Sequence, residues 1–427
     1  MVKNILMICY YYPPLQDVGC KRSVAFSYYF KKHGWNPYVL SVKNPDKTFC
    51  TIGDDSPPEG VYIEYSYSVI NPYKFIGIMN AIITRLASIF GIKITRNYLY
   101  DIFCIPDLFW GWIPITVIKG LFLIKRFHID TIYISCSPFS SAIIGVLLKL
   151  FSGKQLILDF RDPFALAINS IMGVPKPRRI LNKFLEKWFI NKSDIFIVTT
   201  EELKKEYINQ YPWIKDKIYA VHNGFDANFL YLNKKEKFSK FTIIYTGDFY
   251  DYALPLKVFT DIFFGAISFL KNSGKISNNN FQFLFYGQGK QEVEKVARDL
   301  SIQDLVITSS RIPYEQVLNI VSRSHLQLLR IVKPMISTKL YEGISLNIPF
   351  IATIPHGEVE KMIKKYSPSS SILNEESTIE DVANAIIDVI THYNNNTIKD
   401  NSVNEFLENF SREKLSQKLI QLIEWNL

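Results

Sequence analysis

The sequence lacks the features that mark secreted, redox-active or membrane-spanning proteins. Its five cysteines are an odd number, and no two of them have Cys-x-x-Cys spacing, which argues against a disulfide framework or a zinc site. The apolar stretch at 108–118 is shorter than the roughly 20 residues that a membrane-spanning helix needs. The apolar amino-terminal stretch ends at Pro13, so we expect a first buried strand rather than a signal peptide. These absences predict a protein of the reducing cytoplasm.

Motifs of metal, phosphate and nucleic-acid chemistry are missing as well. There is no Asp-x-Asp triplet to hold a metal-bound diphosphate and no Gly-x-x-x-x-Gly-Lys-Ser/Thr loop, and the six histidines show no metal-ligand spacing. Gly287 and Gly289 begin a dinucleotide-like fingerprint, but Glu292 occupies the position of its third glycine, which disfavours NAD. The net charge is +9 without a Lys/Arg block, so we expect anionic lipid or phosphorylated small molecules as partners and no nucleic acid. No metal and no cofactor are predicted.

Length and patterning predict two α/β domains. A chain of 427 residues exceeds one ordinary core and suits two domains of about 200 residues each. Short apolar runs alternate with helical patterns, and several runs are apolar on both faces, as in a parallel sheet covered by helices. A charged stretch at 232–240 separates two such series. We therefore predict doubly wound domains at 1–232 and 233–410 facing across a cleft, and a last helix at 411–427 packing back on the first domain.

The predicted strands fall into two groups, one in each domain. Each is four to seven residues long. They are 4–10, 38–42, 131–135, 155–158, 195–199 and 218–221 in the first domain, and 242–245, 282–286, 305–308, 326–329 and 350–353 in the second.

Two polar segments follow strands of the first domain, where ligands bind in open α/β sheets. The loop at 12–22 contains Gly19, Lys21 and Arg22 and leads into a helix whose amino end can receive a phosphate or sugar. Asp159–Pro163 places two acids and Arg161 at a strand end, where burial of charge is costly. Each segment also has a purely structural interpretation, an ordinary turn for the first and a salt bridge for the second.

The sharpest motif of the second domain is Pro334–Gly343. Ser337 can cap the helix that follows it, so that free N–H groups near Thr338 to Leu340 point at an anion. Lys339 adds a positive charge, and Glu342 can accept two hydroxyls of a ribose. The alternative is a capped surface helix with one Lys/Glu pair.

Together these segments resemble glycosyltransferase family 4, retaining enzymes of the GT-B fold, and most closely the branch that builds bacterial capsule, O-antigen and exopolysaccharide. The resemblance extends over most of the chain. The matching segments are Pro13-Pro14 with Gly19 and Arg22, Ser135–Pro138, Asp159–Pro163, Glu186, Val198–Thr200, Asn223–Asp226, Tyr245–Gly247, Gly287 with Gly289, Ser337–Glu342 and Ile348-Pro349.

The resemblance implies a role for each domain. The second domain would bind a nucleotide sugar, expected to be UDP-linked, and the first domain would bind a lipid-linked or other saccharide acceptor. The donor-binding residues would be Gly247, Gly287, Gly289, Arg311, Pro313, Ser337, Thr338, Lys339, Leu340 and Glu342. The acceptor-binding residues would be Gly19, Lys21, Arg22 and Asp159, and the catalytic residues Arg161, Asp162 and Lys339.

The sequence departs from the family at two places. Many members carry an acid eight residues before the ribose-binding glutamate, where this chain has Pro334. Many also place an Arg and a Lys after the first strand of the second domain, where this chain has 247–252 and then Lys257. Diphosphate neutralisation would then depend more on Lys339 and the helix end.

The expected mechanism is a front-face transfer, in which the departing diphosphate oxygen takes the acceptor proton and positive groups stabilise its charge. Retention of configuration is implied by the resemblance alone. Two alternatives remain open, a nucleotide-sugar epimerase on the same fold and a non-catalytic partner subunit.

Residues 70–128 predict contact with an anionic membrane. This window has seven cations against Asp101 and Asp107, with aromatic and apolar residues among them, as in interfacial helices. The alternative is that the apolar residues form the domain core. With the lipid-linked acceptor, the pattern predicts a peripheral protein at the cytoplasmic face of the plasma membrane.

Overall fold

The chain folds into two compact units, Met1–His222 with Leu415–Leu427 and Asn223–Lys414. The boundary precedes the predicted one at 232/233 because the short helix η3 (Ala227–Lys234) belongs to the second unit, where Leu232 packs with Ile244 and Leu284. The computed structural model describes residues 3–48, 50, 53, 56–92, 98–166, 175–247, 256–331, 336–374, 376–395 and 403–426.

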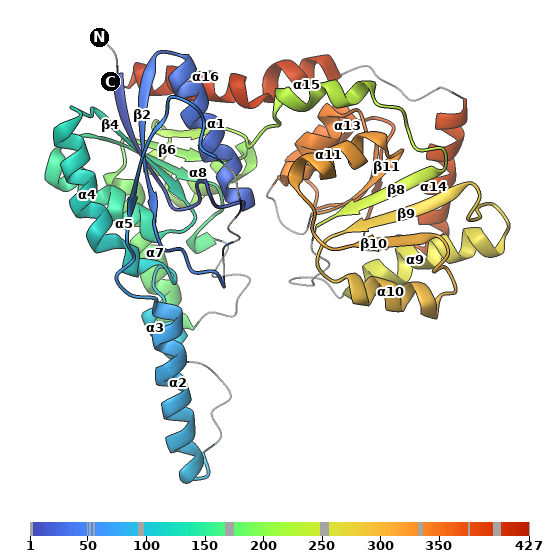
Figure 1. Ribbon diagram of the computed structural model, residues 1–427, viewed down its shortest axis with the longest axis horizontal. Helices are drawn as coiled ribbons and strands as arrows, with labels where there is room; N and C mark the ends of the chain where they lie inside the picture. The colour runs from blue at the N-terminus through green and yellow to red at the C-terminus, as the bar shows by residue number, and fades with distance from the viewer. Residues whose placement is uncertain are drawn as a thin grey trace. The chain divides into compact units, whose positions relative to one another are not determined.

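The first unit contains a seven-stranded parallel sheet with the strand order β3-β2-β1-β4-β5-β6-β7 (Figure 1). Its strands are β1 (Lys3–Cys9), β2 (Trp35–Val42), β3 (Tyr62–Ser66), β4 (Thr131–Cys136), β5 (Gln155–Phe160), β6 (Ile195–Val198) and β7 (Ile218–Ala220). Its helices are α1 (Val18–Lys32), α2 (Pro72–Ile89), α3 (Tyr98–Phe103), η1 (Trp110–Trp112), α4 (Ile113–Arg126), α5 (Ser140–Ser152), α7 (Lys176–Lys192), α8 (Glu201–Gln210) and η2 (Pro212–Ile214).

Helices cover both faces of this sheet because its central strands are apolar on both sides. In β1, Leu6 and Ile8 pack into the core under α4, α5, α7 and α8, whereas Ile5 and Met7 point to the opposite layer. That layer is formed by α1 and by α16 (Arg412–Trp425), whose Leu419 is fully buried against it. The last helix thus packs on the first sheet.

The second unit contains a six-stranded parallel sheet with the order β10-β9-β8-β11-β12-β13. Its strands are β8 (Phe241–Thr246), β9 (Phe281–Tyr286), β10 (Val306–Ser309), β11 (Leu326–Arg330), β12 (Phe350–Thr353) and β13 (Ser371–Leu373). Its helices are α9 (Leu256–Asn272), α10 (Lys290–Asp299), α11 (Tyr314–Arg323), α12 (Thr338–Ser345), α13 (Glu358–Tyr366), α14 (Ile379–Asn394) and α15 (Val403–Phe410).

Alternating side chains of β8 again divide this sheet's core into two layers. Ile243 packs with α9, α10 and α14, and Ile244 packs with α11 on the other face. The predicted α/β class with two doubly wound parallel sheets is therefore confirmed. Within the described part of the chain, none of the helices combines the length and the apolar character that crossing a membrane would require.

Candidate functional site

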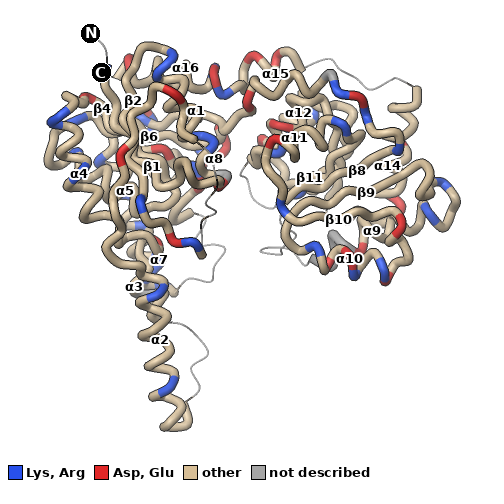
Figure 2. The backbone as a smooth tube through the Cα atoms, viewed as in Figure 1, with Lys and Arg blue, Asp and Glu red and all other residues tan. Residues whose placement is uncertain are grey.

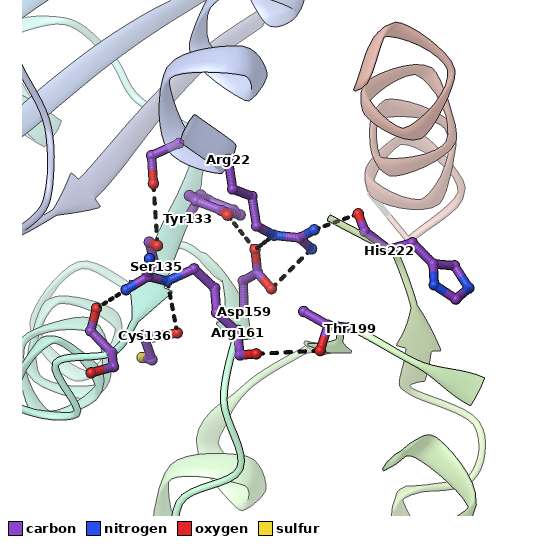
Figure 3. Close-up of polar contacts among 10 residues, drawn as sticks. Arg22, Tyr133, Ser135, Cys136, Asp159, Arg161, Thr199 and His222 are labelled. Atoms are coloured by element: carbon purple, nitrogen blue, oxygen red, sulfur yellow. Dashed lines mark hydrogen bonds and ion pairs between the residues drawn. The ribbon is translucent and has the colours of Figure 1, made fainter. Parts of the chain in front are cut away.

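A buried ion pair lies at the carboxyl edge of the first sheet (Figure 3). Arg22, on the first turns of α1, donates to both carboxylate oxygens of Asp159 at the end of β5, with Nε–Oδ2 and Nη2–Oδ1 distances of 2.7 and 3.1 Å. The Tyr133 hydroxyl from β4 also donates to Asp159. Arg22 is 4% exposed and Asp159 is not exposed at all. The buried ion pair, together with Tyr133, therefore links α1, β4 and β5 beneath the protein surface.

The same guanidinium reaches His222, the last residue of the segment Met1–His222 of the first unit. Nη1 of Arg22 donates to the His222 carbonyl oxygen at 2.7 Å. Burial lowers the pKa of Arg22, but Asp159 and Tyr133 together outweigh burial, so the net shift of this pKa is upward. The His222 ring is itself buried, and burial together with Lys418 and Arg22 lowers its pKa to about 3. At neutral pH the cluster thus consists of one full ion pair beside a neutral imidazole.

Arg161 lies beside this pair in a separate arrangement. Its guanidinium donates to the carbonyl oxygens of Cys136, the last residue of β4, and of Ser137, which follows it (Figure 3). A Cβ atom at Gly19 would lie 2.3 Å from Nη1 of Arg161, so only glycine allows this approach. The Arg161 guanidinium also lies 5.5 Å from the Tyr11 ring centroid. The structure thus brings together Gly19 and Arg161, which the sequence predicts as acceptor and catalytic residues.

The neighbouring predicted residues are placed differently. Asp162 is exposed, and Lys21 is half-buried on α1. Arg22 and Asp159 are buried, so their charges do not lie on the surface. Each is neutralised by the other in the ion pair. The expected cluster of Asp159, Arg161 and Asp162 is therefore divided, with Asp159 pairing with Arg22 in the interior.

A second buried carboxylate supports the loop that follows β5. Glu186 of α7 accepts hydrogen bonds from the Ala165 N–H at 2.7 Å, the Tyr207 hydroxyl at 3.0 Å and the Tyr211 hydroxyl at 3.1 Å. Burial raises the pKa of Glu186 to about 7, although these three donors lower it. Glu186 thus fixes the backbone just beyond Arg161 and Asp162.

The strands β10, β9, β8 and β11 are neighbours in the parallel sheet of the second unit, so they end at one edge, where Gly247 and Gly287 follow β8 and β9. Gly247 and Gly287 are in close backbone contact, since a Cβ at Gly287 would lie 1.8 Å from the Gly247 carbonyl oxygen. Gly247 has φ +116°, a conformation that side chains rarely adopt. Both positions therefore require glycine. We call the adjoining backbone of these two residues the Gly247–Gly287 floor.

Lys339 extends over that floor from the first turn of α12. A Cβ at Gly247 would lie 2.3 Å from Lys339 Nζ, which also lies 5.2 Å from the Tyr245 ring centroid. Ser337 is the N-cap of α12, and its hydroxyl accepts from the Lys339 N–H at 3.3 Å. The ammonium group of Lys339 thus lies against Gly247 and comes from the positive end of a helix, two features that suit an anion.

Glu342 lies one turn further along α12, with 8% of its surface exposed. Its Oε1 accepts a hydrogen bond of 2.6 Å from the hydroxyl of Tyr314, the first residue of α11. The alternative of a surface helix with a Lys/Glu pair does not fit this burial. Thr338 is half-buried beside Ser337, and Leu340 is fully buried in the core.

The remaining predicted residues occupy the same edge. Arg311 and Pro313 are exposed between β10 and α11, and Gly289 is the N-cap of α10. Pro334 and residues 248–255 lie outside the described residues, and so does the side chain of Lys257. In the part of the chain that is described, no three His, Cys, Asp or Glu side chains gather as metal ligands would.

Residues 93–229, about a third of the chain, match the family model described as glycosyltransferase family 4. The chain is thus a glycosyltransferase that is similar to family 4 over these residues. No protein with a curated function matches the sequence.

Solved structures similar to this glycosyltransferase span nearly its whole length. A glycosyltransferase from Rickettsia africae is 14% identical with a TM-score of 0.62, covering 99% of this chain and 98% of its own. A sucrose-phosphate synthase from Thermosynechococcus elongatus is 13% identical with a TM-score of 0.68 and the same coverage. HepE from Anabaena, solved with UDP-glucose, is 12% identical with a TM-score of 0.61 and covers 99% of both chains. At these identities the likeness shows the GT-B fold.

Two residues of the glycosyltransferase's sheet edges were not predicted as part of a site. Tyr133 contacts Asp159, and Tyr314 contacts Glu342. Tyr314 directly follows Arg311–Pro313, and its position at the start of a helix after β10 could have indicated that it belongs to the site. Tyr133 lies inside a strand, where nothing in the sequence separates it from a core aromatic.

Proposed function

We propose that this glycosyltransferase moves a sugar from a nucleoside-diphosphate sugar, UDP-linked, to a lipid-linked saccharide, with retention of configuration and without a metal. The second unit holds the donor and the first unit holds the acceptor. The product would belong to a bacterial capsule, O-antigen or exopolysaccharide. The observation that carries the proposal is the approach of Lys339 Nζ to Gly247 at the amino end of α12.

The donor site follows from the chemistry of that edge. The Gly247–Gly287 floor lets a diphosphate approach the backbone, with the α12 N–H groups and Lys339 opposite its charge. Glu342 accepts hydroxyls of the ribose, as its carboxylate is held on the next turn of the same helix. Ser337, Thr338 and Leu340 supply backbone, while Gly289, Arg311 and Pro313 border the nucleoside. HepE, with the same fold, has been solved with UDP-glucose, which agrees with a UDP-linked donor.

The acceptor site centres on Arg161. Its guanidinium is held by two backbone carbonyls and lies against Gly19, so its position is fixed before any acceptor binds. Exposed Asp162 orients the acceptor hydroxyl, and Lys21 contributes charge nearby. Arg22 and Asp159 are buried, and they serve this site by holding α1 and β5 in place.

The reaction then needs few groups from the protein. The acceptor hydroxyl attacks the anomeric carbon on the face that the diphosphate leaves, and the departing phosphate oxygen takes its proton. Lys339 and the amino end of α12 stabilise the charge that grows on that oxygen, and this stabilisation is stronger in the transition state than in the bound donor.

An assay of UDP release from UDP-sugars tests the proposal, with and without a lipid-linked saccharide fraction. Release should require the acceptor, persist in a metal chelator, and give a product whose anomeric configuration, measured by NMR, matches the donor. Release that is equal without acceptor would indicate an epimerase or hydrolase instead. Loss of release on chelation would refute metal independence, and an inverted product would refute retention.

A further inference from the structure

Helix α2 exposes apolar side chains along nearly its whole length. Figure 1 shows it projecting from the first unit, with α3 at its base. Of its described side chains, only Pro72 and Ile76 are buried. The exposed apolar residues are Phe75, Ile78, Met79, Ile82, Ile83, Leu86 and Ile89, with exposed fractions from 37% to 72%. The sequence alternative that this stripe forms the domain core is therefore wrong for α2.

The exposed residues of α2 form one stripe with cations beside it. At about 100° per residue, the apolar positions span an arc of about 140°, roughly two-fifths of the helix circumference. Lys74 and Arg85 both fall at one border of that stripe, and α2 contains no Asp or Glu. Figure 2 shows the helix without acidic segments. An apolar stripe bordered by cations is typical of helices that lie in the interface of an anionic bilayer.

Helix α7 adds a second surface of the same chemistry, which the sequence pattern did not indicate. Its exposed face carries the cations Lys176, Arg179, Lys183 and Lys187. Ile180 and Phe184 lie among them, 62% and 64% exposed. The acid of this helix, Glu186, points into the interior, where it bonds Ala165, Tyr207 and Tyr211. The exposed face of α7 is therefore cationic with apolar residues interspersed.

Hydrogen bonds join these helices into one surface. Arg178 of α7 donates to the carbonyl oxygens of Tyr100 and Cys104 at 3.2 and 2.8 Å. The Tyr100 hydroxyl in turn donates to the Tyr73 carbonyl oxygen of α2 at 3.4 Å. We call the exposed residues of these helices the α2–α7 surface. Besides buried Glu186, Asp101 is the acid within the three helices.

We propose that the α2–α7 surface docks the glycosyltransferase on an anionic lipid bilayer, with the α2 stripe in the headgroup–acyl boundary and the α7 cations against lipid phosphates. This inference specifies the membrane surface at which the proposed transfer takes place, and it rests on that proposed function. Charge complementarity selects lipid over a second copy of the chain. A dimer through this surface would place the α7 cations of two copies together.

The surface lies on the side of the unit where the acceptor site is. Helix α2 follows the carboxyl end of β3, and α7 begins beyond the β5 loop that contains Arg161. Docking would thus bring Arg161 and Gly19 to the lipid surface, where a lipid-linked saccharide presents its sugar. The same helices serve to bind the bilayer and to bring the acceptor edge toward it.

Flotation of the full chain with vesicles tests the proposal. Phosphatidylcholine vesicles with phosphatidylglycerol should bind the protein, and phosphatidylcholine alone should bind it far more weakly. The variant Arg179→Gln/Lys183→Gln should reduce partitioning on the anionic vesicles about twenty-five-fold, at about fivefold for each charge. The variant Ile82→Asn/Leu86→Asn should reduce it at least about a hundredfold, because two apolar side chains no longer enter the bilayer.

Matched controls lie away from the surface. Lys275→Gln/Lys295→Gln removes two exposed lysines of the second unit, and Phe151→Asn removes a 69% exposed aromatic residue at the end of α5. Both should partition like the unmodified protein. Equal losses in the controls and the variants, or binding that ignores lipid charge, would overturn the proposal. So would dimers in solution that the α2 variant dissociates, with no vesicle binding by the unmodified chain. UDP affinity, measured by calorimetry on the same variants, should stay unchanged, which separates failure of docking from failure of the donor site.

Discussion

The Tyr314 hydroxyl donates a hydrogen bond of 2.6 Å to Oε1 of Glu342. The donor comes from the start of α11 and the acceptor from the second turn of α12, so the bond links the loops that follow β10 and β11. Burial and the Glu342 carboxylate raise the pKa of Tyr314. The hydroxyl therefore stays protonated at any working pH and holds the carboxylate in one orientation.

Replacing Tyr314 by Phe should weaken UDP binding. The ring would still fill its space, but Glu342 would lose the donor that orients it. Because the carboxylate itself remains and only its orientation is lost, UDP binding should weaken by about 1–1.4 kcal/mol, or roughly fivefold to tenfold. Calorimetry with UDP and with 2′-deoxy-UDP measures the effect. If the loss is the same for both nucleotides, Tyr314 acts on the site without involving the ribose 2′-hydroxyl.

Lys339→Ala should lower turnover more than donor affinity. Its ammonium lies over Gly247, where the charge of the departing diphosphate would grow during the reaction. Losing such an interaction lowers kcat by about tenfold to a thousandfold, with a smaller change in UDP affinity. Lys295→Ala, which removes an exposed lysine of α10, provides the control. Steady-state kinetics beside calorimetry separates the two effects, and a loss confined to UDP affinity would contradict this role.

Arg22→Met should destabilise the first unit strongly. It would leave Asp159 buried with Tyr133 as its remaining described partner, and breaking a buried ion pair in this way costs about 3–5 kcal/mol. Lys31→Met, at an exposed position of the same helix, should change the free energy of unfolding by only about 0.5 kcal/mol or less. Urea unfolding followed by tyrosine and tryptophan fluorescence measures both. Similar stabilities for the two variants would show that the pair is not needed for folding.

Stability should decrease with rising pH through the titration of Glu186. In the folded protein this carboxyl keeps its proton up to about pH 7, whereas its ordinary pKa is 4.5. Between these values the folded state binds more protons than the unfolded state, so this group's contribution falls as pH rises and is constant above them. Relative to Glu186→Gln, the wild type should lose about 3 kcal/mol of unfolding free energy across that range.

The control for this titration is Glu201→Gln, which changes an exposed carboxyl of α8. It should not alter the slope of stability against pH. The measurement is urea unfolding at a series of pH values. Parallel curves for the wild type and Glu186→Gln would mean that Glu186 titrates in the folded protein as it does in water.

Most of the sheet architecture could be predicted because its strands are buried on both faces and read as continuous apolar runs. The strands that were missed, β3 and β13, lie at the edges of their sheets and are largely half-buried or exposed. An edge strand has fewer apolar positions, so its pattern resembles a polar loop. What failed was thus the identification of short, partly exposed strands.

The parts of the candidate site that lie in loops directly after strands could be predicted, because parallel strands end at the same edge of a sheet. Gly247, Gly287 and Lys339 follow or approach three neighbouring strands, so the topology brings them together. The Arg22–Asp159 pair was not predictable, because it depends on how α1 packs across β4 and β5. The sequence placed Asp159 with Arg161, two residues further on, because alternation in a strand puts residues at that spacing on one face. The strand β5 ends at Phe160, however, so Arg161 lies in the loop and donates to the carbonyl oxygens of Cys136 and Ser137 instead.

The UDP affinity of Glu342→Gln, measured by calorimetry, tests the proposed donor site most directly. A carboxylate that accepts ribose hydroxyls contributes charge-assisted bonds worth about 1.5–3 kcal/mol, so the variant should bind UDP about tenfold to a hundredfold more weakly. Glu380→Gln, an exposed carboxyl on α14, should bind like the wild type, and both variants should remain folded. Unchanged UDP affinity in folded Glu342→Gln would contradict the donor site at this edge and the mechanism built on it.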